Sequence, residues 1–259
     1  WSSDVCSSDL SNIVVIGTVT ERAWVRTQSW RLADDEIKVV DEYKYLGAET
    51  GKVRGRWNTF LSRIWAATRK HCNQVMWMAG GRRGLRPRSL LHLWEVYCRP
   101  KVEYAPELWE GAISKSWVDK MESLQTKVVR VALGTPSSAS AAGLRAEAGL
   151  QTLVSRRWAA RLTFFRKLAA APRGNLASII FRCRCVEVDE GRAQRSWCHR
   201  TKALLERLNL DLLWQPMQRE PLSKVQWRAV VQRAVKERAA ASEAALVAES
   251  STLSLYRRS

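Results

Sequence analysis

The feature that most constrains the fold is a helical spacing of mainly apolar residues that begins near Lys52 and continues to the end of the chain. Its clearest section repeats such residues three and four positions apart, so that one helix face would pack and the other would meet solvent. Gly80 and Gly81 are expected to end this first helix. The residues of its packed face are Trp57, Leu61, Ile64, Trp65, Thr68, Cys72, Val75 and Met76.

Two further helices are predicted from start and stop signals. One begins near Pro87, because proline is tolerated in a first helical turn, and ends before Pro100, while Pro106 is expected to bend or interrupt the next. The packed face of the helix after Pro87 consists of Leu90, Leu91, Trp94 and Tyr97. The other has Ser116 as its N-cap and ends at Gly134, with a packed stripe of Trp117, Met121, Leu124, Val128 and Val131.

The C-terminal part is also expected to be helical. Residues 150–172 are amphipathic, and helices are expected near 193–208 and 223–247. The inward face of the first of these segments consists of Leu153, Trp158, Leu162, Phe165 and Leu168.

The N-terminal part has a different pattern. Residues 11–50 contain β-branched runs separated by polar turns, which indicate short strands. Residues 1–10, WSSDVCSSDL, lack the basic and apolar regions of a signal peptide and resemble one reading frame of a sequencing-library adapter. We expect them to be an artefactual leader, with a short acidic tail as the alternative. The expected fold is therefore mainly α, with a small N-terminal strand remnant.

Composition favours a polyanionic partner. The net charge is +18 and the pI is about 10.2, so nucleic acid is the first candidate and a membrane surface the second. A membrane surface is disfavoured, because basic amphipathic membrane helices usually stand apart from a globular fold, whereas hydrophobic residues make up 46% of this chain. No apolar run reaches the roughly 20 residues of a membrane span, and no membrane partner is expected. Of six cysteines, Cys6 lies in the suspect leader. The other five, an odd number at irregular spacing, argue against a disulfide framework and indicate a reducing compartment, which predicts a soluble, intracellular protein.

Four segments occur in a fixed order: VVDEYKYLGAET, LLHLWEVYCRPKVEYAPELWEG, LQTKVVRVALGTP and LRAEAGLQTLVSRR. Together they resemble the region that follows the catalytic palm in reverse transcriptases of non-LTR retrotransposons. The resemblance covers residues 13–170, and Pro106 departs from it where relatives tend to have a continuous helix. The matching residues are Tyr45, Leu46, Gly47, Tyr97, Pro100, Val102, Tyr104, Trp109, Gln125, Arg130, Leu133, Gly134, Pro136, Leu144, Glu147, Gly149 and Leu150.

The resemblance implies a domain organisation and a partner. Residues 11–50 would be the last strands of a palm, 51–135 a helical thumb, and 136–259 a further helical region. The parent enzyme would be an RNA-directed DNA polymerase that uses Mg²⁺, acting in the nucleus on an RNA–DNA hybrid or duplex. The palm and fingers would be further partners of this fragment.

The catalytic carboxylates of such an enzyme are not recognisable here. Two-metal chemistry needs an aromatic-x-Asp-Asp turn and an earlier aspartate. The nearest match, Asp34-Asp35, follows Leu32 instead of an aromatic residue and lies where relatives have an acidic hairpin turn. We predict a solvated turn, no catalytic residue and no polymerase activity for this chain alone.

A basic segment is the candidate binding site. Residues 51–94 contain ten Lys or Arg and no Asp or Glu, whereas an ordinary solvated face mixes both signs. Arg56, Arg63 and Lys70 are spaced by seven, so they share one stripe away from the apolar face. The alternatives are an unoccupied basic surface and a scaffold protein that binds an acidic partner. The other candidate phosphate contacts are Lys52, Arg54, Arg82, Arg83, Arg86 and Arg88.

Two other patterns have a structural and a functional interpretation. Most of the thirteen tryptophans lie on apolar helix faces, which favours core packing, but Trp77 beside the arginines is a candidate for base stacking.

A second pattern is a possible zinc site. Zinc binding is disfavoured by its Cys-x-Cys spacing, so buried or incidental thiols are the preferred interpretation. The residues of that candidate zinc site are Cys183, Cys185, Cys198 and His199.

Overall fold

The structure, a computed structural model, describes most of the chain. The described residues are 12–14, 19–32, 35–36, 38–40, 43–45, 48–50, 57–80, 84–172, 174–194, 196–214 and 222–249. Over these residues the protein is mainly α with short N-terminal strands, which confirms the expected fold class. It divides into two compact units, Trp1–Ala66 and Ala67–Ser259.

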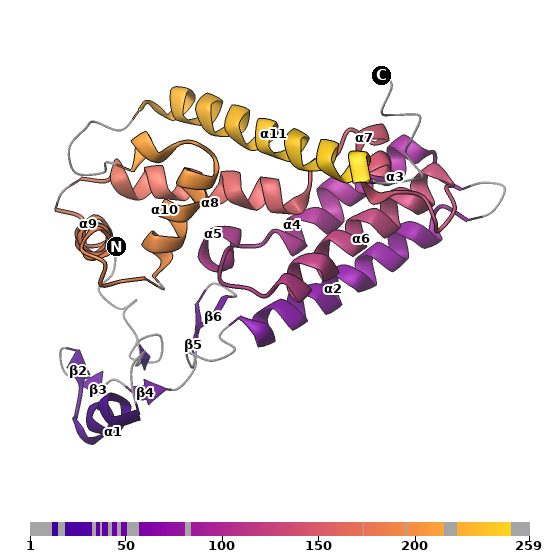
Figure 1. The fold of residues 1–259 in the computed structure, drawn as a ribbon. Helices are drawn as coiled ribbons and strands as arrows, with labels where there is room; N and C mark the ends of the chain where they lie inside the picture. The colour runs from indigo at the N-terminus through magenta and orange to yellow at the C-terminus, as the bar shows by residue number, and fades with distance from the viewer. Residues whose placement is uncertain are drawn as a thin grey trace. The chain divides into compact units, whose positions relative to one another are not determined.

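The strands of the first unit form three two-stranded sheets (Figure 1). β1 (Asn12–Val14) pairs in parallel with β4 (Lys38–Val40), placing Ile13 opposite Val39. β2 (Arg31–Leu32) and β3 (Asp35–Glu36) are antiparallel, with Leu32 opposite Asp35. β5 (Tyr43–Tyr45) and β6 (Ala48–Thr50) form another antiparallel pair.

The first unit also contains a helix that the sequence pattern did not predict. α1 (Val19–Thr27) carries several β-branched residues, which by propensity favour strands. Its last carbonyls accept side-chain hydrogen bonds, because Thr27 Oγ1 donates to Trp24 O at 2.7 Å and Trp30 Nε1 donates to Val25 O at 2.9 Å. These contacts satisfy carbonyl groups that have no partner inside the helix.

The first two helices after residue 57 lie where the sequence predicts them. α2 (Asn58–Trp77) ends just before Gly80, and α3 begins at the expected residue (Pro87–Leu93). The prediction that this helix ends before Pro100 was wrong, because the chain continues through a π-helical turn, η3 (Trp94–Cys98), into α4 (Arg99–Val102). Pro100 lies in the first turn of α4, where its missing N–H costs little.

The π-helical turn also corrects the packed face. Trp94, Cys98 and Val102 are buried, whereas Tyr97 is exposed. A π turn holds one more residue than an α turn, so the residue that follows Trp94 into the core is Cys98 instead of Tyr97. The side chain of Tyr97 is therefore available at the surface.

Two other helix starts differ from expectation. Pro106 does not interrupt a helix but begins one, α5 (Pro106–Trp109), after Ala105 adopts a positive φ of 47°. The assignment of Ser116 as an N-cap was wrong, since α6 (Lys115–Leu133) has Ser114 in that position. Of the predicted α6 stripe, the middle residues are buried and Val131 is exposed.

The remaining helices form the C-terminal part of the second unit. They are α7 (Ala141–Glu147), α8 (Leu153–Ala169), α9 (Leu176–Asp189), α10 (Trp197–Arg207), the 3-10 helix η4 (Asp211–Leu213) and α11 (Lys224–Glu249). α9 was not predicted, because exposed apolar residues such as Leu176 and Ile180 blur its periodicity. Within the described helices, none is long and apolar enough to cross a membrane.

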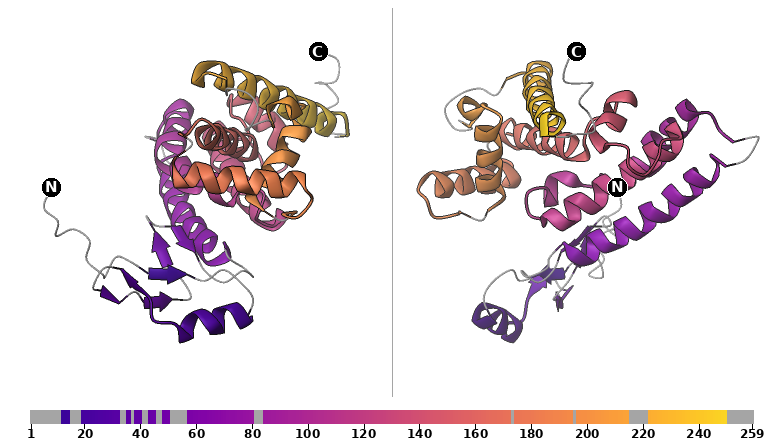
Figure 2. Two further views of the ribbon diagram at one scale, coloured as in Figure 1. Left: turned by 90° about the vertical axis from the view of Figure 1, so that its left-hand side faces the viewer. Right: turned by 45° about the vertical axis from the view of Figure 1, so that its right-hand side comes forward.

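An aromatic core joins these helices. α11 lies alongside α8 in both views of this region (Figures 1 and 2). The Phe165 ring of α8 stacks on Trp214 at 5.6 Å and on Trp227 of α11 at 5.9 Å, and it meets Phe181 of α9 edge-on. Trp94 and Trp109 are also buried, so core packing is confirmed for these tryptophans.

Two arginines of α8 are buried, which the net charge alone did not reveal. Arg157 donates from Nε to Glu110 Oε2 at 2.7 Å, and neither side chain is more than slightly exposed. Arg161 donates to Thr201 Oγ1 and to Trp197 O, each at 2.8 Å, and to the carbonyl of Glu110. Burial and the nearby Arg200 guanidinium lower the pKa of Arg161 to about 10, so it remains charged at neutral pH.

Gly111 provides a test of this buried cluster. It has a φ of +72°, and a Cβ built there would lie 2.8 Å from Nη1 of the buried Arg161. We expect Gly111→Ala to lower the free energy of unfolding by about 2 kcal/mol or more, from backbone strain plus displacement of the guanidinium. Urea denaturation measures this.

Gly134 supplies the matched control for that substitution. It has a φ of +64°, but a Cβ added there would have no neighbour within 4 Å, so Gly134→Ala isolates the backbone strain. It should cost about 1 kcal/mol. Equal losses at the two positions would show that contact with Arg161 contributes nothing.

Glu122 predicts a pH dependence of stability. Burial raises its pKa, although Oε1 accepts a hydrogen bond from Val154 N at 3.0 Å and Arg157 and Arg145 lie nearby. The folded state therefore binds the proton more tightly than the unfolded state does. Stability should fall as pH rises from the ordinary glutamate pKa of about 4.3 through the raised folded value.

Replacing Glu122 by glutamine tests whether this residue causes the loss of stability as pH rises. Glu122→Gln should remove this decline in unfolding free energy, measured by denaturation at a series of pH values. Glu237→Gln, at an exposed position on α11, is the control and should leave the decline in place. A decline that persists unchanged in Glu122→Gln would assign it to other groups.

Candidate nucleic-acid interface

α2 separates its apolar and basic residues onto different faces. The buried residues are Phe60, Leu61, Ile64, Thr68, Cys72 and Val75. Arg63 and Lys70 are exposed, and their seven-residue separation places them on one face about 10 Å apart along the helix. The expected division of this helix is confirmed for the described residues.

The other candidate phosphate contacts fall into two groups. Arg86 and Arg88 flank the start of α3 and are exposed, with Arg86 as the N-cap residue. The remaining candidates lie outside the described residues. They are Lys52, Arg54, Arg56, Arg82 and Arg83.

Three of the described cations have no nearby carboxylate to neutralise them. Within the part of the chain that the structure describes, Lys70, Arg86 and Arg88 have no ion pair. Arg63 lies over the Phe60 ring, with its guanidinium carbon 5.9 Å from the centroid. Because residues 51–94 contain no Asp or Glu, this segment presents positive charge alone.

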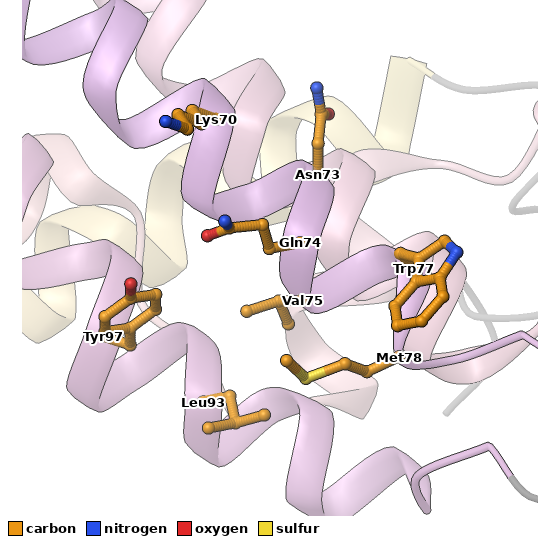
Figure 3. Close-up of a pocket in the computed structure, with 8 residues that line it drawn as sticks. All are labelled: Lys70, Asn73, Gln74, Val75, Trp77, Met78, Leu93 and Tyr97. Atoms are coloured by element: carbon orange, nitrogen blue, oxygen red, sulfur yellow. The ribbon is translucent and has the colours of Figure 1, made fainter.

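An open groove lies between α2 and the α3–η3 helix. Its volume is about 800 Å³. The lining residues are Lys70, Asn73, Gln74, Val75, Trp77, Met78, Leu93 and Tyr97 (Figure 3). Sequence patterning identified Lys70 and Trp77 but missed this groove, because it assigned Tyr97 to the core.

The walls of the groove are held in place by local contacts. His71 meets the Tyr97 ring edge-on at 4.7 Å, and the Lys101 ammonium lies 4.0 Å from the ring centroid. Behind them, the buried thiols of Cys72 and Cys98 share a hydrogen bond, which together with burial raises the pKa of Cys72. These contacts fix η3 against the C-terminal half of α2, so the groove is preformed.

The four residues of the zinc candidate do not form one cluster. Cys183 is exposed on α9 and Cys185 is buried, because residues two apart on a helix do not face each other. Cys185 instead shares a hydrogen bond with Cys198, and this bond and burial raise its pKa. Among the described residues, no group of three or more His, Cys, Asp or Glu could hold a metal ion.

The acidic pair considered as a metal site lies partly outside the described residues. Asp35 is on β3, paired with Leu32, and Asp34 is not described. Asp35 therefore lies in a strand, and the solvated turn expected at Asp34 falls outside the described residues.

Comparison with known proteins adds no family assignment. The chain matches no family model, and neither a curated protein nor a solved structure is significantly similar to it. Its function is therefore argued from its own residues and geometry.

Proposed function

We propose that this chain is a C-terminal fragment of a non-LTR retrotransposon reverse transcriptase, with the last palm strands, the helical thumb and a further helical region, and that it grips an RNA–DNA hybrid or duplex. The observation that carries the proposal is the one-sided α2, which packs an apolar face and exposes Arg63 and Lys70, in a segment, residues 51–94, whose sequence contains no Asp or Glu. The family in this proposal rests on the ordered motifs from Tyr45 to Leu150.

The proposed binding mode is contact with the phosphate backbone. Long cationic side chains on an exposed helix reach phosphates without reading base edges, so they position a duplex and carry little sequence information. Arg86 and Arg88 extend the positive surface at the start of α3. Low sequence preference and steep salt dependence follow.

In this proposal the chain itself performs no polymerisation. The Mg²⁺-dependent chemistry belongs to palm carboxylates of the parent enzyme, for which Asp34 and Asp35 are poor substitutes because Leu32 replaces the aromatic residue before them. The chain contributes grip on the template–primer. Its place of action would be the nucleus, alongside the palm and fingers.

A titration with a blunt RNA–DNA hybrid tests the proposal. Fluorescence anisotropy at several salt concentrations gives the slope of log affinity against log salt. Four phosphate contacts, from Arg63, Lys70, Arg86 and Arg88, should give a slope of roughly −3 to −4. A slope near zero, or no binding at low salt, would refute it.

The second candidate function is a helical scaffold that binds an acidic protein. The net charge of +18 favours an acidic partner, and α9, which exposes Leu176, Ile179 and Ile180, offers apolar surface that a protein could cover. Such a protein should bind an acidic peptide more tightly than it binds the hybrid at equal salt. The same titration with both ligands separates the two functions.

A further inference from the structure

The groove beside the basic face has the chemical character of a base-binding site. Val75, Met78 and Leu93 provide apolar surface, while Asn73 and Gln74 add amides that donate and accept hydrogen bonds (Figure 3). A nucleobase has apolar faces and a polar edge, which is the combination that such a lining complements. The groove contains one charged residue, the cation Lys70.

Trp77 is the aromatic platform of this groove. Its side chain is 84% exposed at the last residue of α2, and it has no aromatic or cation–π partner among the described residues. An indole so exposed gains nothing from core packing. Tyr97, by contrast, already carries the Lys101 ammonium over its ring.

Trp77 also continues the basic stripe. Arg63, Lys70 and Trp77 follow one another at seven-residue intervals on α2, so they lie on one exposed face at steps of about 10 Å. A nucleic-acid backbone held by the two cations would therefore bring its next nucleotides to the indole.

Arg86 adds positive charge near the groove. The backbone N–H of Leu85 donates to Met78 O at 2.9 Å, which fixes the residue before Arg86 next to the groove wall. With no acidic residue from 51 to 94, this surface is complementary to a polyanion.

We infer that the groove binds an unpaired nucleotide, whose base stacks on Trp77 while Lys70 contacts its phosphate. The inference rests on the proposed function, and it adds single-stranded nucleic acid as a ligand of the same surface. Stacking accepts any base, because every base has a π-face. Asn73 and Gln74 are the side chains placed to contact the base edge.

The test compares three probes by fluorescence anisotropy at one salt concentration. They are a labelled mixed-sequence single strand, the same strand with abasic sites throughout, and a blunt RNA–DNA hybrid. The wild-type protein should bind the intact strand roughly 5- to 100-fold more tightly than the abasic strand, because only the former can stack. The hybrid reports the proposed function separately.

Three substitutions at Trp77 then separate stacking from simple apolar contact. Trp77→Ala and Trp77→Leu should each lose most of the preference for the intact strand, whereas Trp77→Phe should keep it. Binding of the blunt hybrid should stay within about 2-fold in all three, since its bases are paired. Because the side chain is exposed, the variants should keep the wild-type circular dichroism and melting temperature.

Trp24→Ala is the matched control, since Trp24 is 60% exposed in the first unit. It should leave binding of the single strand unchanged. Equal wild-type affinity for the intact and abasic strands would overturn the inference, as would wild-type affinity of Trp77→Leu for the intact strand. An acidic peptide whose binding depends on Trp77, without such dependence for the single strand, would assign the groove to a protein partner and also overturn it.

Discussion

Replacing Glu110 by alanine is expected to lower the free energy of unfolding by about 3–5 kcal/mol, because it leaves a charged guanidinium buried without its counter-ion. The lost partner is Arg157, whose Nε lies 2.7 Å from Glu110 Oε2 and whose side chain is fully buried. The guanidinium carbon also lies 5.4 Å from the Trp109 ring centroid, a contact that Glu110→Ala leaves in place. Chemical denaturation measures the loss.

A double variant shows whether the buried ion pair stabilises the protein more than two apolar side chains would at the same positions. Nη2 of Arg157 has no hydrogen-bond partner among the described residues, so the pair is imperfectly satisfied. Replacing both members by apolar residues, Glu110→Leu with Arg157→Met, should recover most of the stability. A double variant as unstable as Glu110→Ala would show that the polar contacts themselves are needed.

An exposed ion pair serves as the control for Glu110. Arg184 and Glu187 are 2.6 Å apart on the surface of α9, with the Arg184 side chain more than half exposed. Glu187→Ala should change the free energy of unfolding by no more than about 1 kcal/mol. Comparable losses at Glu110 and Glu187 would contradict the role assigned to burial.

Reversing the charge of Arg63 and Lys70 together is expected to weaken binding of the RNA–DNA hybrid about 100-fold at low salt. Each contact of a cation with a phosphate is a charge-assisted hydrogen bond, and two such contacts are lost. The slope of log affinity against log salt should become shallower by roughly 2, since two fewer counterions are released. Because the contacts are to phosphates, the loss should be uniform across sequences.

The control carries the same change in net charge at another site. Arg228 and Arg233 are exposed on α11, and changing both to glutamate alters the total charge as Arg63→Glu with Lys70→Glu does. This control should reduce affinity only slightly, through the long-range field. If both double variants weaken binding equally, the stripe on α2 is not the binding face.

The helices were predictable where the apolar spacing was regular and where proline or glycine marked the first or last turn. Pro87 begins α3, and Gly134 ends α6 with a positive φ of 64°, a conformation that favours glycine. α9 escaped prediction because part of its apolar surface faces outward, as Ile180 does. The π turn at Trp94–Cys98 could not be read from spacing, since its apolar residues fit an ordinary helix almost as well.

Two of the residues that carry the family resemblance make hydrogen bonds between neighbouring segments. Gln125 Nε2 donates to Gln151 O at 2.9 Å, tying α6 to the start of α8. Arg130 Nη2 donates to Ala139 O at 3.1 Å across the turn after α6. These side chains hold connections between helices in place, and the family assignment remains a proposal.

Of the candidate site, the sequence could predict the charges but not the groove. The absence of Asp and Glu from residues 51–94 can be seen in the sequence, and the seven-residue spacing of Arg63 and Lys70 already implies a shared face. The groove exists because Tyr97 lies at the surface instead of in the core, and this position follows from the π turn. Trp77 was the one tryptophan singled out, because it stands beside glycines and arginines at a helix end.

The sequence alone determined that this protein is mainly helical, because apolar periodicity acts locally along each segment and needs no knowledge of what the helix packs against. Only the tertiary structure decided which arginines are buried and which are exposed. Arg157 and Arg161 look like surface cations in the sequence, yet both are buried against groups 40 to 51 residues away, whereas Arg63 and Lys70 stay exposed. Charge can be counted in a sequence, but burial depends on contacts between segments that the sequence keeps apart.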